Sequence, residues 1–332
     1  MLVNLILLFD MTNKKDNDTL NLVEAIENIA LQEEIKKNNP DWITKAETLC
    51  EALPYMRRFA GETFVIKFGG SAMGDETNIR NFAQDVVLLK QIGINPIVVH
   101  GGGPQIGQML KKLNIKTSFV DGLRVTDSQT VDVVEMVLSG TINKQIVQKI
   151  TDAGGMAVGL SGKDGGLITA KKLTKTKKDP DSNIEKILNL GYVGYPEKID
   201  PEILTVFENT DVIPVIAPIG TGENGETYNI NADTVAGAIA GCLRAAKLII
   251  LTDVDGVILP NKELVSHLNV ATAKQLIKDN IITGGMIPKV ETCIKALEKE
   301  VECAHILNGS IDHILLMELF TESGAGTMIY YG

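Results

Sequence analysis

The feature that most constrains the fold is an alternation of short apolar stretches with amphipathic segments, which begins at residue 63. The apolar stretches, of which TFVIKF and PIVVH come first, have the length and composition of strands that are buried on both faces of a sheet. The segments between them, such as 79–92, carry apolar residues at helical spacing. This alternation predicts an α/β fold in which helices cover both faces of a mainly parallel sheet.

Glycines follow the first two strands directly, at 69–70 and at 101–103. In an open α/β sheet, ligands bind outside the carboxyl ends of the strands. Glycine backbone N–H groups attract anions, and Pro104 suits the first turn of a helix whose N-terminus would point to the same place. Because Lys67 adds a cation, the sequence predicts an anion site. The alternative is an edge strand whose lysine reaches water.

Two common phosphate-binding motifs are absent from the sequence. The stretch SGKD at 161–164 lacks the terminal hydroxyl of a P-loop, and GGGPQIG places its last glycine one residue too late for a dinucleotide-binding fold. A P-loop ATPase and a standard dinucleotide fold are therefore both disfavoured.

Three further motifs carry side chains suited to ligand binding. Arg124 lies beside a glycine in GLRVT, where its guanidinium could hold a carboxylate with two hydrogen bonds. The stretch NINAD at 229–233 places amides and a carboxylate before a helix, although it could equally be a cluster of helix-capping residues. Lys289 lies early in a helix after two glycines, and a solvated helix lysine is the simpler interpretation.

Composition excludes several classes of protein. The formal net charge of −10 argues against a nucleic-acid or membrane-surface binder. The four cysteines and four histidines are scattered, so we expect no metal bound by the protein and reduced thiols, as in a cytoplasmic protein. Residues 2–9 are apolar but too short to span a bilayer, and they lack the features of a secretory signal.

The sequence before the first strand predicts helices without a core of their own. Residues 1–40 are expected to be a leader, partly helical or disordered, and Met11 is a second candidate for the start. Residues 41–60 form a predicted helical arm for docking or oligomer contact, which Pro54 should kink or stop. A change in composition predicts a division of the remainder into lobes at 61–244 and 245–332.

Taken together, VIKFGGS, VVHGGGPQI, DGLRVT, NINAD, LTDVDGV and ITGGMIPK resemble the amino acid kinase family, in the family's order and from about residue 42 onward. The resemblance implies a three-layer αβα sandwich with an acceptor-binding N-terminal lobe and an ATP-binding C-terminal lobe. The motifs agree best with members that phosphorylate the side-chain carboxylate of N-acetyl-L-glutamate in arginine biosynthesis. These members use ATP with Mg²⁺, and the metal is held mainly by the nucleotide phosphates.

The resemblance also implies roles for individual residues. Lys67 and Lys289 match the lysines that stabilise the transferring phosphoryl group, and Asp233 matches the carboxylate that orients them. The acceptor would be held by a second set of residues, with Arg124 on its α-carboxylate, and the nucleotide by a third. The acceptor set comprises Gly102, Gly103, Arg124, Asn229 and Asn231, and the nucleotide set comprises Gly69, Gly70, Thr252, Asp253, Gly256, Val257, Ile282 and Thr283.

Members of the family that arginine inhibits carry an N-terminal helix that links dimers into a hexamer, a trimer of dimers. The sequence around 52–61 and 313–327 resembles the two halves of their arginine site, which predicts arginine as an effector. The expected contacts are Tyr55, Glu318, Glu322, Gly324 and Gly326. A packed C-terminal helix followed by an ordinary turn is the alternative. A PII-type regulator binds some relatives, but no residue here supports one.

Two other functions remain open at this stage. One is a kinase for a different acyl acidic substrate, because a few pocket side chains could redirect specificity. The other is a non-catalytic amino-acid sensor on the same fold, which would be expected to have lost Lys67, Lys289 or Asp233, and all three are present.

Overall fold

The computed structural model describes residues 40–178, 185–321 and 324–332. Residues up to Pro54 and residues from Tyr55 onward form two separate compact units, and the fold described below is that of the second. Its centre is an eight-stranded sheet in the order β14-β16-β15-β13-β1-β2-β10-β5. The strands are β1 (Thr63–Phe68), β2 (Asn95–His100), β5 (Met156–Ser161), β10 (Val212–Ala217), β13 (Lys247–Thr252), β14 (His267–Asn269), β15 (Cys303–Asn308) and β16 (Thr327–Tyr330).

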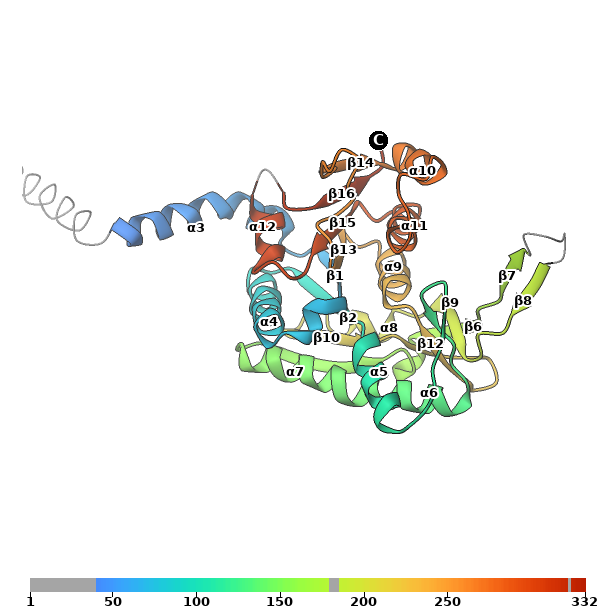
Figure 1. The fold of residues 1–332 in the computed structure, drawn as a ribbon. Helices are drawn as coiled ribbons and strands as arrows, with labels where there is room; N and C mark the ends of the chain where they lie inside the picture. Colours follow the sequence, from blue (N-terminus) through green and yellow to red (C-terminus); the bar gives the residue numbers. More distant parts are fainter. Residues whose placement is uncertain (1–39, 179–184, 322–323) are drawn as a thin grey trace, which may run out of the picture. The chain divides into compact units, whose positions relative to one another are not determined.

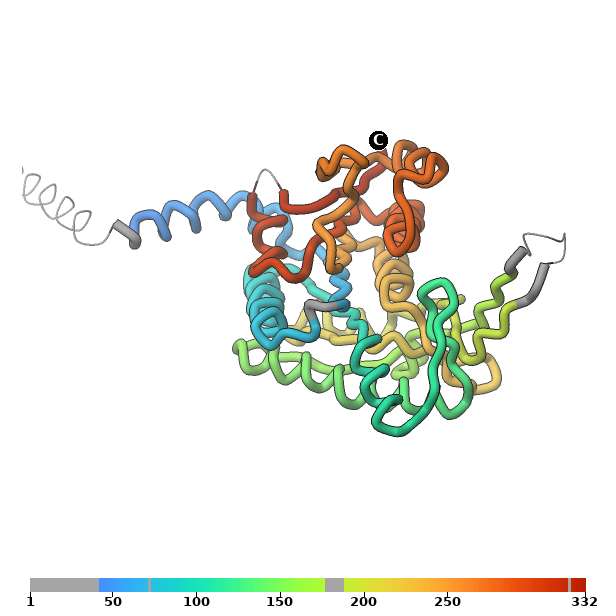
Figure 2. The backbone as a smooth tube through the Cα atoms, viewed as in Figure 1, coloured from blue at the N-terminus to red at the C-terminus, as the bar shows by residue number. Residues whose placement is uncertain are grey.

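The pairing is parallel throughout this sheet except between β15 and β16. Strands far apart in the sequence lie side by side, since Phe64 of β1 pairs with Lys247 of β13. Figure 2 shows this as a blue strand beside an orange one. The predicted mainly parallel α/β sheet is therefore confirmed.

Each face of the sheet carries its own hydrophobic core, because side chains alternate along a strand. In β1, Phe64, Ile66 and Phe68 point into one core and Val65 into the other. Helices α4 and α12 lie on the first side and α9 and α11 on the second, which gives the expected three layers (Figure 1). The helices are α4 (Glu76–Gln91), α5 (Gly103–Lys112), α6 (Ser128–Glu135), α7 (Asn143–Asp152), α8 (Glu202–Thr205), α9 (Ala232–Leu243), α10 (Val270–Lys278), α11 (Met286–Leu297) and α12 (Ile314–Phe320).

Short polar side chains begin several of these helices. Asp75, Asp127, Asn231 and Asn269 each accept a hydrogen bond from a backbone N–H in the first turn of α4, α6, α9 and α10. Such caps satisfy N–H groups that have no partner inside the helix. The capping role that the sequence left open for NINAD is thus confirmed for Asn231.

Helices α6 and α7 form one continuous helical stretch with a π-helical segment between them. Met136–Ile142 lies between α6 and α7 and follows i→i+5 hydrogen bonding. π-helical turns of this kind occur frequently at functional sites. Nothing in the apolar spacing distinguishes the π-helical turn from an α-helix.

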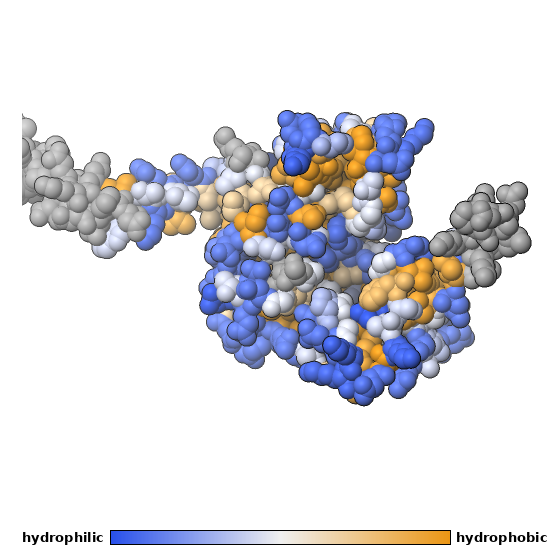
Figure 3. Space-filling model, viewed as in Figure 1, coloured by the Kyte–Doolittle hydropathy of each residue, from blue (hydrophilic) through white to orange (hydrophobic). Residues whose placement is uncertain are grey.

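A second, smaller sheet accompanies the main one. Strands β11 (Ile219–Thr221), β12 (Thr227–Ile230), β9 (Val193–Ile199) and β6 (Ile168–Lys172) close into a four-stranded barrel. Two short hairpins complete the strands, β3–β4 (Phe119–Val120, Leu123–Arg124) and β7–β8 (Lys175–Lys178, Glu185–Leu188). On the face drawn in Figure 3, hydrophobic side chains gather over the region of β9 and near the C-terminal elements, between areas of hydrophilic side chains.

The helical arm is α3 (Pro40–Phe59), which begins at Pro40 and runs through Pro54. Of the two predicted effects of Pro54, the stop is wrong, because the helix continues past it, and the kink stays a prediction. The proline ring removes one backbone hydrogen bond, yet the helix continues to Phe59. The ring of Phe59 packs edge-on against that of Phe64, with 5.3 Å between the ring centroids, and this contact holds the end of the helix against the first strand. The predicted leader over 1–40 lies almost entirely outside the described residues. The two-lobe division stays a prediction, and the main sheet runs across it.

No helix within the described ranges is both long and apolar enough to cross a bilayer.

Candidate active site

Lys67 lies on an inner strand, because β1 pairs with β13 on one side and with β2 on the other. Its side chain follows Val65 onto the face that α9 and α11 cover, and the residue is only 6% exposed. Its ammonium group donates a hydrogen bond to the carbonyl oxygen of Leu251 at 3.2 Å. The alternative of an edge-strand lysine that reaches water is therefore wrong.

Asp233 joins Lys67 to Lys289. One carboxylate oxygen of Asp233 lies 3.0 Å from Nζ of Lys67, and the other lies 2.7 Å from Nζ of Lys289. Asp233 is in the first turn of α9 and Lys289 in the first turn of α11, two helices packed against each other. The Lys289 side chain is 17% exposed, so the solvated-lysine alternative is wrong as well. We call Lys67, Asp233 and Lys289 the lysine clamp.

The electrostatics of the lysine clamp favour an anionic ligand. Burial raises the pKa of Asp233, but the two lysines outweigh it and hold that pKa below its ordinary value, so the carboxylate is charged. Two ammonium groups around one carboxylate leave an excess positive charge. Because this excess lies at the carboxyl end of β1, beside the glycine loops, a phosphate-like anion is the ligand that it fits.

The two glycine loops lie against the lysine clamp and against each other. A Cβ atom on Gly69 would lie 3.0 Å from Cε and Nζ of Lys67 and 3.5 Å from Cα of Gly101. A side chain at residue 69 would therefore push the lysine out of place. Gly70 has a φ of +78°, which favours glycine. A Cβ on Gly102 would lie within 2.7 Å of Ile142 and Leu138 in the π-helical turn, so residue 102 is closely packed as well.

His100 and Asn143 support the second glycine loop, and neither of these two side chains was identified from the sequence. His100 is fully buried, and burial lowers its pKa to about 4, so the ring is neutral. Its Nδ1 lies 2.9 Å from the carbonyl oxygen of Gly101, to which it donates in the neutral ring. Its Nε2 lies 3.3 Å from Nδ2 of Asn143, which also donates to the carbonyl oxygens of Leu160 and Val215. The position of His100 before three glycines was a usable signal, whereas Asn143 lies within a helical pattern.

Arg124 is buried at the other side of the triple-glycine loop. Its guanidinium donates to the carbonyl oxygen of Gly103 at 2.9 Å and to Oγ1 of Thr117 at 3.1 Å, and it stacks on the ring of Phe119. Burial lowers its pKa. Among the residues that the structure describes, no carboxylate pairs with Arg124. Donors of the guanidinium therefore remain for an anion from outside the chain.

The amides of the NINAD motif lie near the same region. Asn229 is on β12 and donates to Oγ1 of Thr126, two residues after Arg124, at 3.4 Å. Asn231 caps α9, the helix that carries Asp233. Asn229 on β12 and Asn231 at the start of α9 thus lie between Arg124 and Asp233 of the lysine clamp along the chain.

The predicted nucleotide residues lie at two positions around the lysine clamp. Thr252 ends β13, which pairs with β1 in parallel, so Thr252 and Asp253 lie at the same sheet edge as the first glycine loop. Thr283 precedes α11, and its carbonyl oxygen accepts a hydrogen bond from the N–H of Met286 at the start of that helix. Val257 and Ile282 are buried in the core on the α11 side, and Gly256 precedes Val257, whose N–H donates to Oγ1 of Thr327.

The model of the amino acid kinase family matches residues 62–308 of the chain. The chain belongs to this family. It is 61% identical to a protein named acetylglutamate kinase from Rhodospirillum centenum, over 87% of the chain and 95% of that relative. It is 62% identical to another of the same name from Rhodospirillum rubrum, over 87% of the chain and 93% of that relative.

A solved structure of N-acetylglutamate synthase from Neisseria gonorrhoeae, in complex with coenzyme A and N-acetyl-glutamate, is similar in fold. Its TM-score is 0.74 at 26% identity, over 86% of this chain. The chain spans 63% of the length of that synthase. The same synthase in complex with coenzyme A and L-arginine gives a TM-score of 0.71 at 25% identity, over 86% of this chain and 65% of that one.

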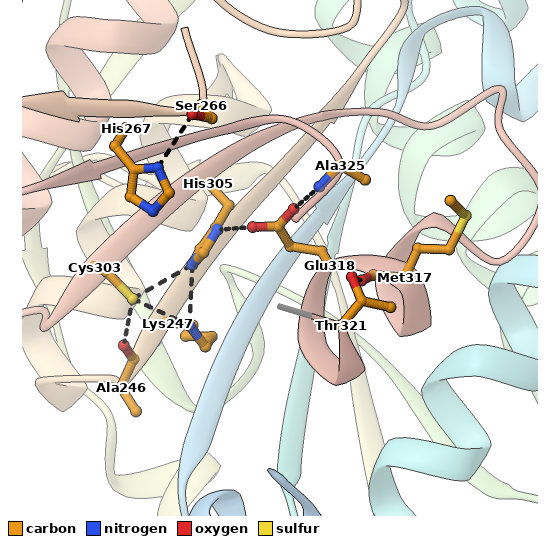
Figure 4. Close-up of polar contacts among 10 residues, drawn as sticks. All are labelled: Ala246, Lys247, Ser266, His267, Cys303, His305, Met317, Glu318, Thr321 and Ala325. Carbon is orange, nitrogen blue, oxygen red and sulfur yellow. Dashed lines mark hydrogen bonds and ion pairs between the residues drawn. The ribbon is translucent and has the colours of Figure 1, made fainter. Parts of the chain in front are cut away.

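Some residues that the family resemblance singled out lie away from the lysine clamp, at the C-terminal helix. Glu318 of α12 accepts a hydrogen bond from the backbone N–H of Ala325 and contacts His305 (Figure 4). Gly324 has a φ of +63° and lies close to the Glu318 carboxylate, whereas Gly326 packs on the carbonyl of Ile306. Tyr55 is partly buried against the core that α12 covers. Glu322 lies outside the described residues.

Proposed function

We propose that the chain transfers the γ-phosphoryl group of ATP to the side-chain carboxylate of N-acetyl-L-glutamate, giving N-acetylglutamyl 5-phosphate and ADP. The observation that carries this proposal is the lysine clamp, in which one buried carboxylate holds two ammonium groups at 3.0 and 2.7 Å. The relatives named acetylglutamate kinase, at 61% and 62% identity over most of the chain, support the choice of acceptor.

The chemistry of the reaction agrees with the side chains available. A side-chain carboxylate has a pKa of about 4.3 and is ionised at neutral pH, so the acceptor needs no general base. The difficulty is the repulsion between an anionic acceptor and a polyanionic donor. The ammonium groups of Lys67 and Lys289 offset that repulsion and stabilise the charge on the transferring phosphoryl group. Asp233 fixes both ammonium groups in position before substrate arrives.

We assign the remaining residues around the lysine clamp to the two substrates. Arg124, whose guanidinium has no carboxylate partner among the described residues, would take the α-carboxylate of acetylglutamate, with help from Gly102, Gly103, Asn229 and Asn231. The loops at Gly69 and Gly70 would offer N–H groups to the nucleotide phosphates. Thr252, Asp253, Gly256, Val257, Ile282 and Thr283 would surround the nucleotide.

Mg²⁺ would reach the site on the nucleotide. Both carboxylate oxygens of Asp233 contact lysine ammonium groups, so the charge of this carboxylate is already balanced by cations of the chain. In the part of the chain that the structure describes, no three His, Cys, Asp or Glu side chains are arranged to hold a metal ion. The phosphates are therefore the ligands that fit, and the bound ion would neutralise charge between the β- and γ-phosphates.

A coupled assay of ADP release tests the proposal. N-acetyl-L-glutamate, glutamate, aspartate and carbamate are compared as acceptors at equal concentration with Mg-ATP. We expect turnover with acetylglutamate to exceed that with each other acceptor by at least about a hundredfold, because on our assignment Arg124 and the triple-glycine loop would hold both ends of an acylated acceptor. No turnover with acetylglutamate would refute the choice of substrate.

We further propose that arginine inhibits this activity by binding at Glu318, with Gly324, Gly326, Tyr55 and Glu322 as further contacts. Glu318 is a carboxylate beside the loop at Gly324, and a carboxylate suits a guanidinium. The synthase of related fold that was solved with L-arginine supports the ligand. Millimolar arginine should lower the rate at sub-saturating acetylglutamate, and Glu318→Gln should abolish that effect. An unchanged wild-type rate would refute the proposal.

We also propose that the chain assembles as a hexamer, a trimer of dimers that requires the N-terminal arm. Light scattering of the full chain and of a variant that lacks residues 1–58 tests this. The full chain should have the mass of six copies and the truncated chain that of two. A truncated chain that retains the hexamer mass would exclude the arm from assembly.

A further inference from the structure

Four titratable side chains meet near the start of β13 and β15, outside the lysine clamp. Cys303 and His305 are two residues apart on β15, so their side chains share a face, and Lys247 pairs opposite Cys303 at the start of β13. Nζ of Lys247 lies 3.2 Å from Sγ of Cys303 and 3.0 Å from Nε2 of His305. Nδ1 of His305 contacts Glu318 at 2.7 Å (Figure 4). We call this set the cysteine cluster.

The cysteine cluster is built like the environment of a reactive thiol. Sγ of Cys303 has two nitrogen neighbours, Nζ of Lys247 and Nε2 of His305 at 3.3 Å. His305 is in turn oriented by the Glu318 carboxylate. A thiol flanked by a cation and by an imidazole that a carboxylate orients is the arrangement that stabilises a thiolate.

The electrostatics agree with the geometry. Burial raises the pKa of Cys303, but the hydrogen bonds and charges of His305 and Lys247 outweigh it and hold that pKa below its ordinary value. Burial also raises the pKa of Glu318, but contact with His305 and the N–H of Ala325 holds it below its ordinary value, so the carboxylate is charged. The surroundings therefore favour the charged forms of both Cys303 and Glu318.

We propose that Cys303 is a modification site, a thiolate that small hydroperoxides oxidise to a sulfenic acid. Cys303 is intermediate in exposure, whereas its partners Lys247 and His305 are buried, so only a reagent of a few atoms would fit. Hydrogen peroxide is the smallest member of this class. The lysine clamp does not use this thiol.

The oxidation step balances in atoms and electrons. The Cys303 thiolate attacks one oxygen of the hydroperoxide, an S–O bond forms and the O–O bond breaks. The sulfur loses two electrons, and the peroxide gains them. The departing oxygen takes a proton from the Lys247 ammonium, and water then returns a proton to the lysine. The products are the sulfenic acid, water or an alcohol, and the hydroxide left when water re-protonates Lys247. A small thiol then condenses with the sulfenic acid to a mixed disulfide and water, and a second thiol returns the Cys303 thiol with release of the small disulfide.

The other cysteines of the chain serve as internal controls. Cys50 and Cys242 are exposed, and burial among neighbouring groups raises the pKa of Cys242. Cys293 is buried in the core, and burial raises its pKa strongly. Exposure alone would favour Cys50 and Cys242 over Cys303. A preference for Cys303 would therefore report on its chemical environment.

Oxidation at Cys303 would also affect its neighbours. It removes a negative charge beside Lys247 and His305, and His305 contacts Glu318, the group that we proposed to bind arginine. The sensitivity to arginine should then differ between the oxidised and reduced proteins. This consequence rests on the proposed arginine site, whereas the reactivity of Cys303 does not.

The experiment is labelling of the reduced, full-length protein with dimedone during exposure to hydrogen peroxide at pH 6, followed by peptide mass spectrometry. We expect Cys303 to be labelled at least about ten times faster than Cys242 and Cys50, because only Cys303 has a cation and an oriented imidazole beside its sulfur to stabilise the thiolate. Equal or slower labelling of Cys303 would overturn the proposal. Cys303→Ser should lose the label, and Cys242→Ser should retain it.

Variants of the partners test the cause. Lys247→Met and His305→Gln should each slow the labelling of Cys303 about tenfold. Labelling of the buried Cys293 reports whether a variant has unfolded. If either Lys247→Met or His305→Gln has unfolded, the variant that remains folded is used to test the proposal. A folded variant that is labelled at the wild-type rate would overturn the assignment of that partner. None of these measurements depends on kinase activity.

Discussion

Removal of the charge on Asp233 is the perturbation for which the structure gives the clearest expectation. The Asp233 carboxylate is almost fully buried and lies 3.0 Å from one ammonium and 2.7 Å from another. At an effective dielectric constant of about 20, each attraction is on the order of 5 kcal/mol before desolvation. In Asp233→Asn both attractions are lost and two buried cations face each other. We expect a loss of about 3–5 kcal/mol in the free energy of unfolding, as for other broken buried ion pairs.

The same change should affect catalysis. The lysines lose the group that orients them, so kcat should fall by about 10²–10³-fold. Urea denaturation and the ADP-release assay measure the two effects on one preparation. Sulfate should stabilise Asp233→Asn more than it stabilises the wild type, because a dianion can replace the lost carboxylate between the lysines, whereas chloride at equal ionic strength should not.

A matched control is available in Asp132→Asn, an exposed position on α6. This variant should change the free energy of unfolding by less than about 0.5 kcal/mol. The reasoning would be refuted if Asp233→Asn unfolded within about 1 kcal/mol of the wild type and retained more than a tenth of its kcat.

Three further substitutions test other parts of the account. Gly69→Ala should lower kcat about tenfold without unfolding the protein, because its Cβ would lie 3.0 Å from Nζ of Lys67 while its extended backbone accepts alanine. Arg124→Lys should raise KM for acetylglutamate at least about tenfold and leave KM for ATP unchanged, because lysine cannot form a two-bond contact with a carboxylate. Burial raises the pKa of Asp85 to about 6, although His313 opposes the rise. Between about pH 4 and 6 this carboxyl is therefore protonated in the folded state and ionised in the unfolded state. The folded state should lose about 3 kcal/mol of stability as pH rises through that range. Asp85→Asn should remove that dependence, as urea denaturation at several pH values would measure.

Each of these three has a contradicting outcome. A normal kcat in Gly69→Ala would mean that the lysine tolerates displacement. Equal changes in both KM values for Arg124→Lys would place this residue in a structural role. Parallel stability curves for Asp85→Asn and the wild type between pH 4 and 7 would show that Asp85 does not titrate there.

The sequence allowed the sheet and the lysine clamp to be predicted, because both depend on local patterns. Two glycines follow the first apolar strand, and this pattern predicts that Lys67 lies at the carboxyl end of that strand. The family resemblance then supplied Asp233 and Lys289, whose motifs are also short and contiguous. The structure brings the ammonium groups of Lys67 and Lys289 within hydrogen-bonding distance of the Asp233 carboxylate.

Other features depend on contacts that no local pattern encodes. The π-helical turn Met136–Ile142 is set by what packs against it, including the loop at Gly102. The cysteine cluster depends on the register between β13 and β15, which places Lys247 opposite Cys303. The residues lie 56 positions apart in the chain, and their pairing follows only once the strand order is known.

The most direct test of the account is the effect of Lys67→Ala on turnover and on acceptor binding, measured separately. If Lys67 acts on the transferring phosphoryl group, kcat with N-acetyl-L-glutamate should fall by about 10²–10³-fold, while the dissociation constant for acetylglutamate from calorimetry should change by less than about threefold. Equal losses in turnover and in binding would contradict the account, because Lys67 would then be only a binding residue.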